Sequence, residues 1–208
     1  MEVQETQTTI IALPAPKTSG TRALELVMST RRSIREYTEE PLTLVELAQL
    51  LWSCQGITST DNLRTTPSAG ATYPLEIYAA VERVSGLVPG VYHYLPGPGI
   101  HKHRIELVHE GEIGKELCEY STKQEFIRIV PVNIIFTGIE ARTRKEYGAA
   151  AARYLLLEVG HAAQNLHLQA EALGLGSVAI GYQAVTHFCE LLLTEAEPLY
   201  MVSVGRKK

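Results

Sequence analysis

The chain has 208 residues, which is enough for one domain with a sizeable hydrophobic core. Its formal net charge of −4 and its pI of about 6.0 exclude an overall positive field of the kind that collects nucleic acid. The three cysteines, Cys54, Cys118 and Cys189, are odd in number and far apart, which argues against a disulfide framework or a structural zinc site and favours a reducing cytoplasm.

The first twenty residues show no hydrophobic periodicity and contain Pro14 and Pro16. We expect them to form an N-terminal arm, one that could wrap a partner subunit, ahead of a single domain at 21–208. The stretch carries acidic residues and no cationic region before a long apolar run, so it resembles neither a secretory signal nor a transit peptide.

A cationic segment, RRSIREY at 31–37, follows a predicted short helix at 21–30. If the segment is extended, side chains alternate between Arg31, Ser33 and Arg35 on one side and Arg32 and Ile34 on the other. The rigid fork of arginine donors suits a phosphate group. From the row alone, a charged surface turn that caps the preceding helix is the alternative interpretation.

A helix is strongly predicted at 42–56, LTLVELAQLLWSCQG. Thr43 and Glu46 have the spacing of a capping box, and Gly56 supplies the stop. The loop that follows, 59–74, contains PSAGATYP, whose small residues would let the main chain approach a flat ligand. An ordinary surface loop explains the same residues about equally well.

The middle of the chain alternates strands with one short helix. Strands are predicted at 75–84 and 130–139, a hairpin at 90–108 and a short helix at 111–121. Interleaved helices, strands and hairpins indicate an α+β fold.

The longest predicted helix runs from Tyr147 to Leu173 and is apolar nearly all round. Charged and polar side chains interrupt it, among them Arg153, Glu158 and His161, which excludes a membrane span. A helix of this kind is buried in a core or in a subunit interface. Glu158 and His161 are close enough in sequence for an acid–base pair or half a metal site, but no third ligand is evident, so we predict no metal centre.

The chain ends with a glycine-rich turn, a helix and an apolar strand. GLGSVAIGY at 174–182 leads from the long helix into a strand, with Gly174 in a helix-terminating position and Gly181 able to expose backbone N–H groups. A helix is predicted at 183–193 and a strand at 197–208, which closes on the basic residues GRKK.

Taken in order, these segments resemble the nitroreductase family of flavoenzymes over about residues 29–206. The resemblance rests on RRSIREY, on PSAGATYPLEIY, on GHAAQNLHLQAEALGLGSVAIGY and on PLYMVSVGRKK. It implies a central, mainly antiparallel sheet flanked by helices, a long buried interface helix, and a homodimer with two FMN sites that are each built from both subunits.

The resemblance also implies the cofactor-binding residues. Phosphate and ribityl contacts would come from Arg31, Ser33 and Arg35, with Arg32 near the pyrimidine edge and Arg206 and Lys207 completing the phosphate clamp. The partner subunit would supply Pro67, Ser68, Ala69 and Gly70, and the backbone at Ile180 and Gly181 would hydrogen-bond to the ring. A nearby guanidinium would stabilise the reduced flavin.

Several segments look closest to the SagB/ThcOx-type branch, whose members include dehydrogenases that oxidise azolines in peptides. That branch typically has K-Y-G-x-R before the long helix. Here Glu146 stands in place of the lysine, Tyr147 matches, and Ala150 stands in place of the arginine. Glu146 and Tyr147 are candidates for proton handling because they stand at the start of the predicted interface helix.

The function implied is an FMN-dependent oxidoreductase in the cytoplasm. NAD(P)H would be the electron donor, and a nitro compound, a quinone or a free flavin the acceptor, in a ping-pong sequence. Two alternatives remain open: a non-catalytic flavin-binding or storage module, and a SagB-like dehydrogenase that returns electrons to oxygen. No nucleic-acid or membrane partner is expected.

Overall fold

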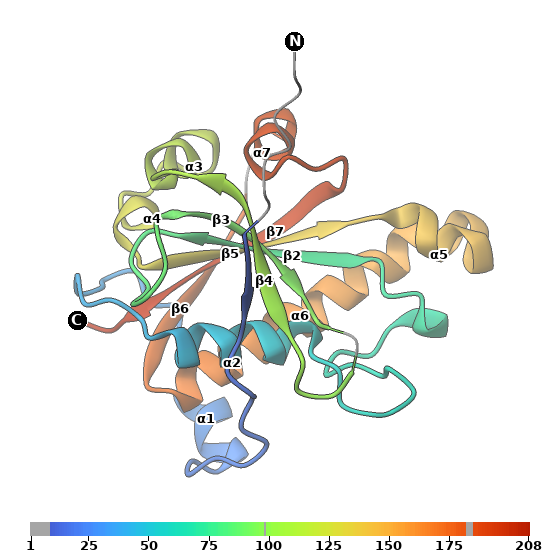
Figure 1. Cartoon of the computed structure of the whole chain (residues 1–208), viewed down its shortest axis with the longest axis horizontal. Helices are drawn as coiled ribbons and strands as arrows, with labels where there is room; N and C mark the ends of the chain where they lie inside the picture. Colours follow the sequence, from blue (N-terminus) through green and yellow to red (C-terminus); the bar gives the residue numbers. More distant parts are fainter. Residues whose placement is uncertain (1–8, 98, 182–184) are drawn as a thin grey trace.

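A single antiparallel sheet organises the protein (Figure 1). The computed structural model describes residues 9–97, 99–181 and 185–208. The strand order is β1-β4-β3-β2-β5-β7-β6, and every neighbouring pair is antiparallel. The strands are β1 (Ile10–Ala12), β2 (Leu75–Val81), β3 (Gly90–Leu95), β4 (Arg104–Glu110), β5 (Val132–Gly138), β6 (Leu175–Ile180) and β7 (Glu197–Arg206). The prediction of a mainly antiparallel central sheet in an α+β fold is confirmed.

Helices cover both faces of this sheet, as Figure 1 shows. On one face lie α1 (Leu24–Thr30), α2 (Leu44–Gln55) and α6 (Ala151–Ala172), and on the other α3 (Gly114–Tyr120), α4 (Phe126–Ile129) and α7 (Val185–Leu192). Each face has its own hydrophobic core, and β5 is buried along its whole length because it lies between the two. This arrangement explains why β5, VNIIFTG, is mostly apolar.

Helix α2 begins with the predicted capping box and ends at the predicted glycine. Thr43 Oγ1 accepts a hydrogen bond from the Glu46 backbone N–H at 3.2 Å, and Glu46 Oε2 accepts one from the Thr43 backbone N–H at 2.8 Å. The capping box is therefore complete. Gly56 ends the helix, and its N–H donates to the Trp52 carbonyl.

The N-terminal arm contributes a strand that the sequence did not predict. Residues 10–12 pair antiparallel with β4, with Ile10 opposite Glu106 and Ala12 opposite Arg104. The following segment runs along α2, where the Lys17 N–H donates to Gln49 Oε1 at 2.8 Å. A three-residue edge strand is too short for a periodic pattern to reveal it. The first eight residues of the predicted arm lie outside the described residues.

The long helix begins later than predicted, and the prediction of its start at Tyr147 was wrong. Tyr147 ends a separate helix, α5 (Glu140–Tyr147), and Gly148 then adopts φ +53° before α6 begins at Ala151. Only a glycine adopts this left-handed backbone without strain. Among the described residues, no helix has the length and apolarity needed to cross a bilayer.

Candidate functional site

The cationic segment 31–37 lies along the free edge of β6 and beside the end of β7. The Ile34 N–H donates to the Ser177 carbonyl at 3.1 Å, and the Thr38 N–H donates to the Arg206 carbonyl at 3.0 Å. A side chain at Gly176 would place its Cβ 2.9 Å from Ile34, so this glycine is needed for the close approach. The fold thus brings residues near both ends of the sequence together.

In this segment the apolar side chain faces the core, and the polar side chains are half-buried or exposed. Ile34 packs on the core formed with α3, α4 and α7, whereas Arg31 is half-buried and Arg32, Ser33 and Arg35 are exposed. Arg32 donates to the carbonyl oxygen of Arg31 at 2.7 Å. Neither Arg31 nor Arg35 forms an ion pair with another described residue. Both guanidinium groups can therefore accept an anionic ligand.

Glu171, near the end of α6, connects the two ends of the chain at this place. Its carboxylate accepts hydrogen bonds from Thr30 Oγ1 at 2.9 Å and from Lys207 Nζ at 2.5 Å, and Arg22 Nη2 lies 3.3 Å away. Burial alone would raise the pKa of Glu171, but the hydrogen bonds from Lys207 and Thr30 and the charges of Lys207 and Arg22 hold it below its ordinary value. Because Thr30 precedes Arg31, Glu171 holds Lys207 near the start of the cationic segment.

Arg206 is turned toward a different partner from Lys207. Its Nη2 lies 3.0 Å from Glu46 Oε2 and its Nε lies 3.4 Å from Glu40 Oε2. Glu46 thus caps α2 and binds a residue 160 positions away in the sequence. Carboxylates thus hold both Arg206 and Lys207 here, and their expected joint phosphate clamp stays a prediction.

His167 is a second buried polar group of α6 on the side of the cationic segment. Its Nδ1 is 2.8 Å from Ser177 Oγ, on the strand that the segment borders. Burial, and next the positive charge of Arg31, lower the pKa of His167 to about 4. The imidazole is therefore neutral at physiological pH.

Lowering the pH should reduce the free energy of unfolding, because His167 is buried in its neutral form. Between the unfolded pKa of about 6.5 and the folded pKa of about 4, the unfolded chain binds the proton more readily, so the free energy of unfolding falls as the pH falls. Below the folded pKa, the loss of unfolding free energy due to His167 reaches about 3 kcal/mol, as the size of the pKa shift gives. Urea unfolding of the wild type and of His167→Asn from pH 7 to pH 4 should give a shallower decline for the variant, whereas parallel declines would contradict the assignment.

The PSAG loop, residues 67–70, lies at the other end of α6. Gly70 has φ +59°, and a Cβ there would lie 2.9 Å from the hydroxyl of Tyr147, at the junction of α5 and α6. Ser68 Oγ accepts a hydrogen bond from the Tyr73 N–H at 2.9 Å. Glu158 of α6 interacts with Ser68 of this loop, and Glu171 interacts with Thr30 beside the cationic segment, so the loop and the segment are roughly 20 Å apart along the helix. One chain does not bring Pro67, Ser68, Ala69 and Gly70 to the cationic segment.

The predicted ring-binding residues Ile180 and Gly181 lie at the end of β6 that is far from Arg206. β6 begins at Leu175, opposite Arg206, and ends at Ile180, opposite Met201, which is about 16 Å further along the strand. Gly181 is exposed immediately after it. The last residue of the quoted glycine turn, Tyr182, lies outside the described residues.

The two candidate proton-handling residues end α5. Tyr147 packs edge-on against Tyr154 with ring centroids 4.8 Å apart and is partly exposed, and Glu146 is exposed. Glu158 and His161 do not form the pair considered from the sequence. Glu158 is buried and accepts from Gln55 Nε2 at 3.2 Å, whereas His161 is exposed.

Comparison with known proteins gives a consistent result. The sequence model of the Nitroreductase family matches residues 28–206. The chain is 44% identical over 184 residues to the Methanocaldococcus jannaschii protein named "Putative nitroreductase MJ1384", covering 88% of this chain and 91% of that protein.

Solved structures agree with the sequence match. An Anabaena variabilis protein described as a nitroreductase superposes with a TM-score of 0.82 at 29% identity, over 98% of this chain but only 42% of that chain. A Ralstonia eutropha protein of the same description gives 0.79 at 26% identity, over 96% and 90%. The fold is also shared, at 17% identity and a TM-score of 0.64, with an NADPH:FMN oxidoreductase of Vibrio harveyi complexed with NAD+, over 89% of this chain and 69% of that one.

Proposed function

The chain belongs to the nitroreductase family, and from that premise we propose that it is an FMN-dependent oxidoreductase that passes electrons from NAD(P)H to an oxidised acceptor. The proposal rests on one observation: the cationic segment lies against the start of β6, and Lys207 is held beside the start of the segment by Glu171. FMN, when bound, supplies reversible two-electron chemistry at its ring. Nitro compounds, quinones and free flavin are acceptors that suit this chemistry.

The residues present at this place fit the phosphate end of FMN. Arg31 and Arg35 have guanidinium groups without a carboxylate partner among the described residues, and Ser33 adds an exposed hydroxyl between them. Charge-assisted, forked hydrogen bonds to phosphate are the strongest that arginine makes. We assign Arg31, Ser33 and Arg35 to the phosphate and ribityl oxygens, with Lys207 adding charge while it stays bound to Glu171.

Other residues would orient the ring. The distance along β6 suits a ligand that has its phosphate beside Leu175 and its ring near Ile180 and Gly181, where backbone groups would hydrogen-bond to it. Arg32 would lie near the pyrimidine edge. Arg206 would complete the phosphate clamp with Lys207, and its contacts with Glu46 and Glu40 hold the end of β7 in place.

A second copy of the chain completes the proposed site. Large apolar side chains are exposed on α1 and α6, with Leu24, Met28 and Leu156 at 58%, 58% and 60% exposure. Such a surface is typical of an interface between subunits. In a homodimer, the partner subunit's loop 67–70 would flank the ring, which accounts for its distance from the cationic segment of its own chain.

Tyr147 and Glu146 are proposed for proton handling. The Tyr147 hydroxyl lies against Gly70, within the loop assigned to the ring of the other copy. It could hold a proton at its oxygen beside a bound acceptor, and the exposed Glu146 carboxylate is next to it in the chain.

The test begins with the purified protein and its colour. We expect a yellow protein that releases FMN on denaturation, identified by chromatography, and whose absorption bleaches when it is mixed anaerobically with NADH or NADPH. A colourless protein that does not bind added FMN would overturn the proposal. A yellow protein that neither nicotinamide bleaches would instead support the flavin-binding module.

A further inference from the structure

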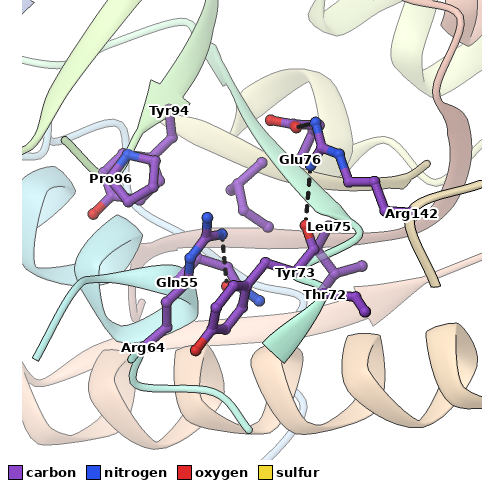
Figure 2. A pocket seen from close by; sticks show the side chains of 10 residues that line it. Gln55, Arg64, Thr72, Tyr73, Leu75, Glu76, Tyr94, Pro96 and Arg142 are labelled. Carbon is purple, nitrogen blue, oxygen red and sulfur yellow. Dashed lines mark hydrogen bonds and ion pairs between the residues drawn. The ribbon is translucent and has the colours of Figure 1, made fainter. Parts of the chain in front are cut away.

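A cavity of about 390 Å³ lies at the opposite end of α2 from the cationic segment. It opens between the end of α2, the start of β2 and the end of β3, and Figure 2 shows its lining. The polar side chains that matter here are Gln55, Arg64, Tyr73, Glu76, Tyr94 and Arg142. Its size is that of a small-molecule site with a few converging polar groups.

Arg64 is the cation in this cavity whose charge is not neutralised by direct contact. Its Nη1 donates to Gln55 Oε1 at 3.1 Å, and its guanidinium carbon lies 4.2 Å from the centre of the Tyr73 ring. It forms no ion pair with another described residue. A half-buried guanidinium has five N–H donors, and here most of them are left for a ligand.

The neighbouring charges in the cavity cancel one another. Glu76 Oε1 lies 2.5 Å from Arg142 Nη2, and Glu76 Oε2 lies 2.7 Å from His93 Nε2. Arg142 also donates to the Tyr73 carbonyl at 3.0 Å. The Glu76 carboxylate is thus occupied on both oxygens. It and the buried Glu158 act on Arg64 through their charges, but neither makes a direct contact with its guanidinium, so most N–H donors of Arg64 stay free for a ligand.

The backbone that presents Tyr73 is held in an unusual conformation. Gly70, Ala71 and Tyr73 have φ values of +59°, +51° and +43°, and two of these are residues with a Cβ. Left-handed backbone at a bulky residue is sparsely populated and occurs where surrounding contacts enforce it, often at ligand sites. Here the enforcing contacts are Ser68 on the Tyr73 N–H and Arg64 on the ring.

We propose that this cavity binds the oxyanion of a small organic substrate, a carboxylate or a phosphate monoester, with Arg64 as the anion-binding residue and Tyr73 packing beside the ligand. The inference rests on the proposed function, because the cavity begins two residues after the loop 67–70, which is there assigned to the flavin ring of the partner subunit. Two sources of the oxyanion share this chemistry: the electron acceptor, and the 2′-phosphate that distinguishes NADPH from NADH.

Calorimetric titration of the purified protein, with its flavin content measured on the same sample, tests this without turnover. One pair of probes is 4-nitrobenzoate and the neutral 4-nitrobenzyl alcohol, and the other is NADP+ and NAD+. We expect the more anionic member of at least one pair to bind about tenfold more tightly, as a charge-assisted contact would give. The pair that shows the preference identifies the source.

Two variants complete the experiment. Arg64→Gln should reduce the preference to about twofold or less, whereas Arg144→Gln, an exposed α5 arginine outside the cavity, should leave it unchanged. Equal binding within both wild-type pairs, or a preference that persists in Arg64→Gln, would overturn the inference. The wild-type comparison stands even if Arg64→Gln does not fold. Absence of flavin would count against the proposed function and not against the anion site.

Discussion

Replacing Arg31 with glutamine is expected to weaken FMN binding by about ten- to a hundredfold. The reason is that Arg31 is half-buried and has no carboxylate partner among the described residues, so its charge is available to the phosphate. Hydrogen bonds to a charged group contribute about 1.5–3 kcal/mol each, which corresponds to this range. Titration of the flavin-free protein with FMN, followed by quenching of flavin fluorescence, measures the change directly.

Arg104→Gln is the matched control for this experiment. Arg104 is an exposed arginine on β4, which lies near the opposite edge of the sheet from β6. The control should bind FMN like the wild type. Equal affinities for Arg31→Gln and the control would remove Arg31 from the site, and a loss shared by both would indicate that only the overall charge matters.

Local sequence signals predicted most of the fold, because each depends on residues close together in the chain. The Thr43–Glu46 capping box required only spacing and residue type. Helix α5 was not predicted because its sequence, EARTRKEY, is polar with Thr143 as its buried residue, so its helical face carries no hydrophobic pattern. The break at Gly148 was likewise hidden among alanines.

The site was predictable only in part, since its decisive contacts join residues far apart in sequence. Nothing in the sequence around Glu171 indicates that it binds Lys207 and Thr30, and nothing around Glu46 indicates Arg206. Arg64 gave no signal at all. It is a lone arginine in a loop of small polar residues, and its contact with Tyr73 depends on a turn in which two left-handed residues, Ala71 and Tyr73, are not glycines.

Replacing Leu156 and Leu157 together with glutamate is expected to separate the proposed homodimer and to release its flavin. Both side chains are more than half exposed on α6, at 60% and 54%, so the substitutions should leave the folded monomer intact. In a closed interface, each unpaired carboxylate would cost several kcal/mol, which would raise the dimer dissociation constant by about a thousandfold or more. Sedimentation velocity measures the dissociation, and absorbance of the same samples measures retained flavin.

The matched control is Leu193→Glu, because Leu193 is 68% exposed and follows α7 on the other face of the sheet. It should stay dimeric and yellow. A variant that dissociates yet keeps its flavin would show that one copy suffices for binding, and would remove the loop 67–70 of the partner subunit from the site. A variant that remains dimeric would place the interface elsewhere. Loss of both properties together is what a site shared between two chains requires, because the cationic segment and the loop 67–70 are roughly 20 Å apart along α6 in one copy.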